Sequence, residues 1–271
     1  MTNIAFIGAG NMNNAIISGL IKTGYDANKI MVSNPSPEKR QALANELKIK
    51  ETSDNIVAAN FADYIVLGVK PHLITSVCQQ ICAEIDVSNK CFISVAAGCS
   101  IATIEKALKQ PCSVIRTMPN TPSQLGLGVS GIYPSAHTSQ QQKDLAEQLM
   151  SSVGITKWLD NEDEIDHIIA VSGSGPAYFF LFMEAMEKQA ISLGFSEKES
   201  RELVQQTALG AAQMVANNDI PIRQLRENVT SKGGTTQAAL STFVEGGLEQ
   251  LVTKAMNNAL HRAKEMAQNN S

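Results

Sequence analysis

The first twenty residues change hydrophobic period abruptly, and this change limits what the chain can fold into. Residues Ile4 to Ile7 form a continuous apolar run, as expected of a parallel strand covered on both faces. From Ala15 to Leu20 the apolar residues recur at helical spacing. Between the two lies Gly8-x-Gly10, where the first glycine permits a tight turn and the second lets a pyrophosphate approach the amides of the helix N-terminus. The stretch predicts a dinucleotide-binding βαβ unit rather than an ordinary tight turn, although Asn13 replaces the third small residue of that motif.

A second strand over Lys29 to Ser33 follows, and NAD-binding units place an acid at the end of that strand, about 20 residues after the glycine motif. No acid occurs in Ser33 to Pro37, and Asn34 stands near the expected position. An acid would repel a 2′-phosphate, whereas hydroxyls, an amide, Lys39 and Arg40 could hold one. The pattern therefore predicts NADP in preference to NAD. The alternative is that the prolines of this segment simply open a helix that carries both cations on its exposed face.

The composition is that of a soluble enzyme. The 271 residues carry a net charge of −4, which argues against nucleic acid and anionic membranes as partners. No apolar run approaches membrane-spanning length, and the chain enters a strand at once without a signal-peptide pattern, so we expect a cytoplasmic protein. Five cysteines without a C-x-x-C are expected to be reduced and mostly buried, and four histidines without metal-ligand spacing predict no metal site.

The pattern also predicts two domains. Strands are expected over residues 62–69, 91–95, 113–116, 128–133 and 155–159, alternating with helices, and none is expected after Asp160. The predicted fold is an α/β Rossmann-type domain with a parallel sheet over residues 1–160, followed by an all-α domain over residues 161–271. Two prolines in Thr117 to Pro122 predict a rigid, non-helical loop at a strand end, suitable as a wall of a substrate site.

Three stretches of the helical domain are informative. Ala177 to Met186 is apolar nearly all round, so this helix must be buried on several sides, and we expect a second copy of the chain to complete its core. Ser196 to Glu199 is a capping box that opens another helix. Gly233-Gly234 is flanked by hydroxyl residues and precedes a helix that begins near Thr235. The free amides and hydroxyls at this helix N-terminus would suit a substrate carboxylate. The alternative is a plain helix-to-helix turn with Thr235 as N-cap.

Six motifs together resemble the pyrroline-5-carboxylate reductases, the family that catalyses the last step of proline biosynthesis. They are Gly8–Met12, Val69–Pro71, Ala96–Gly98, Arg116–Pro122, Ser172–Tyr178 and Thr230–Thr236. The resemblance covers essentially the whole chain in order, and the last three motifs are far more specific than the first. It implies a homodimer held by the helical domains, often assembled further into a decamer of five dimers.

The resemblance also implies particular site residues. Those implied to contact NADP are Gly8, Gly10, Asn11, Met12, Ser33, Asn55, Val69, Lys70, Ala96 and Ala97, with Asn228 nearby. Those implied to contact the substrate are Ser231, Gly234, Thr235 and Thr236, with Thr236 beside the ring nitrogen as the catalytic residue. Two positions depart from the family pattern: Asn13 replaces the usual Gly or Ala, and Lys232 replaces a proline.

The chemistry agrees with these residues. Reduction of a cyclic imine needs a hydride about 3 to 3.5 Å from the imine carbon, a grip on the carboxylate and a proton on nitrogen, but no strong base. The candidate residues include no His or Cys, and a hydroxyl such as that of Thr236 would suffice to orient an iminium N–H. An NADP-dependent hydroxyacid dehydrogenase would instead need a base, for which only Lys232 is available. A catalytically silent NADP-binding sensor, the third alternative, would need no hydroxyl-rich second site.

Overall fold

A computed structural model describes residues 1–110 and 112–269 of the chain. It divides into two compact units, one made of Met1–Ser174 together with the end of the last helix from Ala259 onward, the other of Gly175–Asn258. The sequence-based division at 160/161 lies just after the last strand, and residues 161–174, which follow it, cluster with the sheet.

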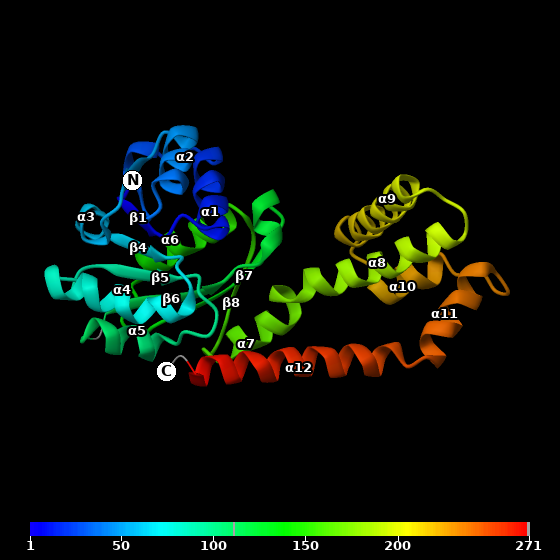
Figure 1. Ribbon diagram of the computed structural model, residues 1–271. Helices are drawn as coiled ribbons and strands as arrows, with labels where there is room; N and C mark the ends of the chain where they lie inside the picture. Colours follow the sequence, from blue (N-terminus) through cyan, green and yellow to red (C-terminus); the bar gives the residue numbers. More distant parts are fainter. Residues whose placement is uncertain (111, 270–271) are drawn as a thin grey trace. The chain divides into compact units, whose positions relative to one another are not determined.

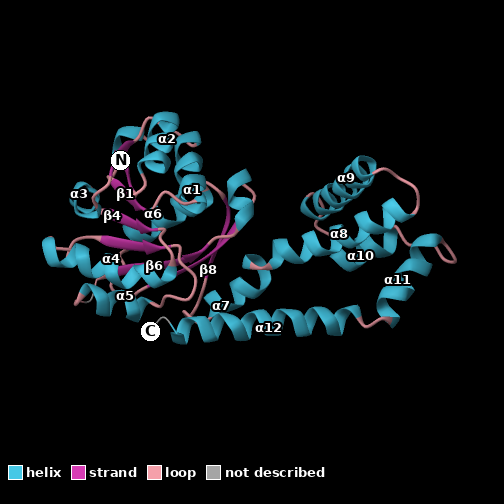
Figure 2. Cartoon of the chain, viewed as in Figure 1, coloured by secondary structure: helices cyan, strands magenta, loops and turns pink. Residues whose placement is uncertain are grey.

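The first unit is built on one eight-stranded sheet with the order β3-β2-β1-β4-β5-β6-β7-β8. Figure 2 shows the strands of this sheet in magenta among the helices of the unit. The strands are β1 (Ile4–Ile7), β2 (Ile30–Ser33), β3 (Lys50–Thr52), β4 (Tyr64–Leu67), β5 (Cys91–Ser94), β6 (Ser113–Met118), β7 (Gly128–Pro134) and β8 (Gly154–Trp158). The strands β1 to β6 are parallel, as predicted for all of them except the short polar strand β3, which was not predicted. The β6–β7 pair is antiparallel, because its short connection cannot accommodate the crossover that a parallel pair requires. The sheet is therefore mixed at this edge, since β8 runs parallel to β7.

Helices cover both faces of the sheet, as the Rossmann-type prediction requires (Figure 1). Along β1, Ile4 and Phe6 face one apolar core while Ala5 and Ile7 face the other, and all four are buried. On the first face lie α1 (Asn11–Lys22), α2 (Pro37–Leu47) and α6 (Gln140–Ser151). On the second lie α3 (Asn55–Phe61), α4 (Pro71–Glu84) and α5 (Ile101–Leu108). A 3-10 turn, η1 (Ala27–Lys29), precedes β2.

The segment predicted as a rigid non-helical loop, Thr117 to Pro122, is partly regular. Its first two residues extend β6, and the 3-10 helix η2 (Thr121–Leu125) includes Pro122 in its first turn. The prediction was wrong here because a proline with fixed φ fits the start of a helical turn as well as it fits a loop. After β8 come α7 (Glu164–Ile168) and a π-helical turn, η3 (Ile169–Gly173).

The second unit is all-α, and no strand follows Trp158 in the part of the chain that the structure describes. Its helices are α8 (Gly175–Ser192), α9 (Glu197–Ala216), α10 (Ile222–Asn228), α11 (Thr235–Glu245) and α12 (Leu248–Asn269), the last of which continues into the first unit. The predicted capping box is confirmed, since Ser196 and Glu199 exchange hydrogen bonds at the start of α9.

The apolar run on α8 is not covered within a single chain. The side chains of Phe179, Phe180 and Leu181 are exposed by 71%, 63% and 68%. The run itself is short, but the helical stretch Glu164–Ser192 that contains it is long and apolar enough to cross a membrane by length and composition. Apolar exposure on this scale marks a surface that another molecule covers.

The cysteines are reduced and mostly buried, as predicted. All five are free: Cys78, Cys82, Cys91, Cys99 and Cys112. Burial raises the pKa of Cys78 and of Cys91 to about 12 and that of Cys112 to about 11, and it also raises the pKa of Cys99. Such thiols are inert small hydrophobes.

Alkylation of the folded protein at pH 8 should therefore modify only Cys82, which is partly exposed. A thiol with a pKa near 12 is ionised at that pH in roughly one molecule in ten thousand, and only the thiolate reacts. Mass mapping after iodoacetamide treatment, with an unfolded sample as control, measures this. Modification of Cys78 or Cys91 in the folded protein before Cys82 would contradict the assignment.

Candidate active site

The glycine turn after β1 is held tightly between two neighbouring strands. The amide of Gly8 donates a hydrogen bond of 2.7 Å to the carbonyl oxygen of Ser33 at the end of β2. Gly8 has a φ of +102°, and a Cβ at this residue would lie 2.7 Å from the carbonyl oxygen of Gly68 at the end of β4. Only glycine satisfies both the backbone angle and the close approach.

The turn places the uncapped N-terminus of α1 at the edge of the sheet. Gly10 is the N-cap of α1 with an extended backbone, and neither a side-chain cap nor an acidic residue occupies the first turn. Among the described residues, nothing accepts a hydrogen bond from the amides of Asn11 or Met12. Free amides at the positive end of a helix dipole form a site for a pyrophosphate.

Asn34 lies beside the turn and holds it. The amide of Ala9 donates to Asn34 Oδ1 at 3.2 Å, and Asn34 Nδ2 donates to the carbonyl oxygen of Ser36 at 3.3 Å. The carboxamide thus ties the glycine turn to the segment after β2. A ribose or phosphate contact from Asn34 stays a prediction, and its side chain already has a structural role.

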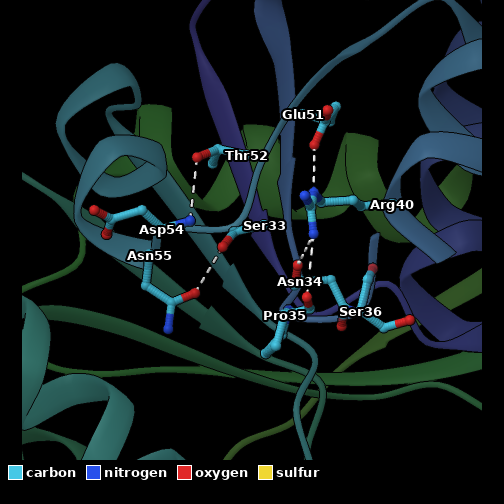
Figure 3. Close-up of polar contacts among 9 residues, drawn as sticks. All are labelled: Ser33, Asn34, Pro35, Ser36, Arg40, Glu51, Thr52, Asp54 and Asn55. Atoms are coloured by element: carbon cyan, nitrogen blue, oxygen red, sulfur yellow. Dashed lines mark hydrogen bonds and ion pairs between the residues drawn. The ribbon is translucent and has the colours of Figure 1, made fainter. Parts of the chain in front are cut away.

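Ser33 and Asn55, which lie far apart in the sequence, meet next to Asn34 (Figure 3). Ser33 is fully buried, and its hydroxyl donates to Asn55 Oδ1 at 2.7 Å. Asn55 begins α3, and its Nδ2 donates to Gln80 Oε1 at 3.3 Å. The structure therefore brings two predicted cofactor residues together at the carboxyl end of β2.

Arg40 is held in place by an acid that the sequence analysis missed. Its Nε lies 2.5 Å from Glu51 Oε2, and its Nη1 donates to the carbonyl oxygens of Asn34 and Pro35, both at 3.1 Å (Figure 3). Glu51 belongs to β3, a short polar strand without a hydrophobic period, so no sequence signal marked it. The Arg40 charge is thus partly neutralised, whereas Lys39 is exposed.

The remaining predicted cofactor residues of this unit follow β4 and β5. Val69 is half-buried and Lys70 is the exposed N-cap of α4. Ala96 is buried and Ala97 is half-buried after β5. Because β2, β1, β4 and β5 are parallel neighbours, their carboxyl ends meet at one edge of the sheet, the usual place for a ligand in such folds.

The hydroxyl-rich loop of the second unit also ends at an uncapped helix. Gly233 has a φ of +73°, and the amide of Gly234 donates to the carbonyl oxygen of Ser231 at 3.0 Å. Gly234, not Thr235, is the N-cap of α11, and no side chain caps it. The alternative with Thr235 as N-cap is therefore wrong, because Thr235 already has helical conformation.

This loop leaves its hydroxyls free for a ligand, although the amide of Gly233 donates to Gln237 Oε1 at 2.5 Å. Ser231, Thr235 and Thr236 are exposed, and no described residue bonds to their hydroxyls or to the amides of the two threonines. Lys232 is exposed in the same loop. Free amides, three hydroxyls and a cation at a helix N-terminus are suited to a carboxylate.

Asn228 is the one predicted cofactor residue that belongs to the second unit. It ends α10 in the second unit, and its Oδ1 accepts from Gln224 Nε2 at 2.9 Å. The other predicted cofactor residues all belong to the first unit. A cofactor contact from Asn228 stays a prediction.

Arg116, the first residue of the Arg116–Pro122 motif, has a structural partner that the sequence did not reveal. Its side chain is buried on β6 and pairs with Glu162 at 2.7 Å, while Glu162 Oε1 also accepts from the amide of Ile101 at 2.8 Å. Asn120 of the same motif donates to the carbonyl oxygen of Ser172 at 2.9 Å and accepts from the amide of Val129 at 2.8 Å. The motif thus joins β6 to the segments that follow the sheet.

The glycine turn, the uncapped helix α1 and the parallel sheet with helices on both faces define a Rossmann-type dinucleotide-binding protein with an appended helical unit. A family model described as NADP oxidoreductase, coenzyme F420-dependent, matches residues 3–98. A second, described as pyrroline-5-carboxylate reductase dimerisation, matches residues 162–266.

Relatives match over nearly the full length. A pyrroline-5-carboxylate reductase from Vibrio alginolyticus is 50% identical over 264 residues, which cover 97% of both chains. The solved structure of a pyrroline-5-carboxylate reductase from Coxiella burnetii has a TM-score of 0.93 at 42% identity, covering 98% of each chain. That of the Plasmodium falciparum enzyme with NADP bound has a TM-score of 0.86 at 28% identity, again covering 98% of each chain. The chain belongs to the pyrroline-5-carboxylate reductase family.

Proposed function

We propose that the chain reduces 1-pyrroline-5-carboxylate to L-proline with NADPH, the last step of proline biosynthesis. The observation that carries this proposal is the loop Ser231 to Thr236, which offers an anion site and hydroxyls but no acid or base other than Lys232. An imine that is already protonated needs a carboxylate grip and a partner for its N–H, and this loop has groups for both.

The nicotinamide, when bound, supplies the hydride that adds to the imine carbon. As the new C–H bond forms, the π electron pair of the C=N bond moves to nitrogen, which keeps its proton. Thr236 Oγ accepts a hydrogen bond from the iminium N–H and so fixes the ring orientation. Ser231 and Thr235 hold the carboxylate with hydroxyl and amide donors, and Gly234, whose amide donates to the carbonyl oxygen of Ser231, lets the carboxylate approach the turn. The resulting amine takes its second proton from solvent.

A hydroxyacid dehydrogenase is the enzymatic alternative, and it requires a general base to remove an alcohol proton. Lys232 is the only candidate in the loop, and its side chain is exposed rather than held against a neighbouring group. A catalytically silent sensor would leave the free amides and hydroxyls of this loop without a role. Both alternatives therefore account for less of the site.

Thr236→Val should lower kcat by about 10²-fold, because the imine ring loses the contact that holds its carbon in line with the hydride. Ser231→Ala should instead raise KM for the imine, since a carboxylate held equally in ground and transition states contributes uniform binding. Steady-state kinetics with both substrates measure the split, and NADPH affinity should change in neither variant. Thr242→Val, the same change at an exposed threonine further along α11, is the control. Turnover of Thr236→Val within about twofold of the unmodified enzyme would remove that hydroxyl from the mechanism.

We propose that NADPH is preferred over NADH, since Ser33 to Pro37 carries no acid that would repel a 2′-phosphate. Ser33, Asn34 and Asn55 supply polar atoms there, and Lys39 and Arg40 supply positive charge. The NADP-bound Plasmodium falciparum relative supports this choice. Glu51 opposes it, because it neutralises Arg40 at the same edge of the sheet.

Glu51→Gln should therefore tighten NADPH binding roughly two- to fivefold with little effect on NADH, as a partly exposed charge contributes about 0.2–1 kcal/mol. Calorimetric titration of both cofactors measures this. Glu46→Gln, which removes an exposed acid from the other end of α2, should change neither. Equal dissociation constants for NADPH and NADH in the unmodified protein would refute the preference itself.

We propose further that the exposed run on α8 is covered by a second copy of the chain, giving a cytoplasmic homodimer that can assemble into a decamer. Phe182 and Phe243 already contact each other at 5.7 Å between ring centroids within one chain, so α11 extends this apolar surface. The helical stretch Glu164–Ser192 is long and apolar enough to cross a membrane by length and composition. A dimer interface explains these apolar residues without placing them in a bilayer.

The full chain should sediment as a dimer or larger without detergent. Leu181→Lys, which places a charge on the exposed run, should shift the population toward monomer at low micromolar concentration. Gln141→Lys, at an exposed position on α6, adds the same charge elsewhere and should leave the mass unchanged. A monomer mass independent of concentration for the unmodified chain would contradict the proposed interface.

A further inference from the structure

We propose that Asn13 and Gly68 form a matched pair that sets the position of the glycine turn: the carboxamide of Asn13 occupies the space that a side chain at residue 68 would need. The inference concerns the nucleotide-binding turn and so rests on the proposed function. It makes Asn13 a positioning residue for the cofactor, acting through the backbone of Gly8.

Asn13 is fully buried in the first turn of α1, and its Nδ2 bonds to the glycine turn. It donates to the carbonyl oxygen of Gly8 at 2.7 Å and to that of Ile7 at 3.3 Å. The carbonyl of Ile7 also accepts from the amide of Gly68 at 2.9 Å. Helix α1 is thus fastened to the end of β1 and, through Ile7, to the residue that follows β4.

Gly68 is the residue that makes room for this side chain. A Cβ at Gly68 would lie 2.3 Å from Cγ, Nδ2 and Oδ1 of Asn13, closer than any real contact. Gly68 does not have the positive φ of Gly8, so its backbone would accept alanine. The three atoms nearest to such a Cβ all belong to the side chain of Asn13, which is therefore the first obstacle to a larger residue at position 68.

Asn13 can move aside to relieve such a clash only by giving up its bonds to the turn. Its Oδ1 is buried and has no hydrogen-bond partner among the described residues, so only Nδ2 fixes the side chain. Turning the amide over would set Oδ1 against two carbonyl oxygens and lose both bonds. In the usual dinucleotide motif a small residue at the position of Asn13 lets helix and strand pack closely. Here the small residue is on the strand side, and the helix side carries two additional hydrogen bonds to the turn.

A double-mutant cycle tests the pair, with NADPH dissociation constants and thermal unfolding of the cofactor-free protein as readouts. Gly68→Ala should raise the NADPH dissociation constant about tenfold and lower Tm, since overpacking displaces Asn13 and with it the Gly8 carbonyl. Asn13→Ala should raise the dissociation constant about threefold, by loss of the two bonds to the turn. Asn13→Ala/Gly68→Ala should bind NADPH better than Gly68→Ala alone and recover most of its Tm. Gly210→Ala, where a Cβ meets nothing within 4 Å, should change neither readout.

Independent, additive effects of the two substitutions would overturn the proposal, as would a double variant no better than Gly68→Ala. If Gly68→Ala does not fold, the proposal still predicts that the double variant folds and binds NADPH. A double variant that does not fold also overturns the proposal. If the unmodified protein binds no NADPH, the proposed function fails instead. The Tm values of the cofactor-free proteins then still decide whether Asn13 and Gly68 are matched.

Discussion

The nucleotide site depends on the close approach of the glycine turn to the ends of two strands. Gly8 bonds to the backbone of Ser33 on one side, and on the other its missing Cβ lets the carbonyl oxygen of Gly68 come near. This packing places the uncapped start of α1 at the carboxyl edge of the sheet, so the amides of Asn11 and Met12 stay free. The anion site is thus made by backbone, and side chains such as Asn13 and Asn34 hold that backbone in place.

The two units present uncapped helix N-termini of the same physical kind, and both are proposed anion sites. In each, a glycine that precedes a helix leaves the first amides uncapped: Gly10 before α1 and Gly234 before α11. They differ in their surroundings, since the first lies among buried strand ends and the second carries exposed hydroxyls. A dinucleotide needs a rigid pyrophosphate cradle, whereas a small imino acid needs donors that orient its ring. The division of residues between the units fits that requirement.

Much of the fold could be predicted from the sequence, because β1 and β4 are continuous apolar runs and helices such as α1 and α4 carry apolar residues at helical spacing. The strand β3 could not, since Lys50–Thr52 is short, polar and at the edge of the sheet. Glu51 lies on this strand and was hidden with it, so Arg40 was expected to be able to hold a 2′-phosphate without the acid that pairs with it. The role of Asn13 was equally hidden, because its partner Gly68 is distant in sequence and becomes visible only through tertiary contact. The hydroxyls of residues 231–236 were predictable as a group, but which residue caps α11 depended on backbone angles.

If the chain is an imine reductase, its choice of substrate separates it from a hydroxyacid dehydrogenase and from a silent sensor. The measurement is loss of NADPH absorbance with 1-pyrroline-5-carboxylate, compared with a panel of 2-keto and 3-keto acids at matched concentrations and with NADH in parallel. An imine reductase will oxidise NADPH rapidly with the cyclic imine and form proline in equal amount. It will not turn over the keto acids above background. Faster turnover of any keto acid, or NADPH binding without oxidation in the presence of the imine, would contradict this function.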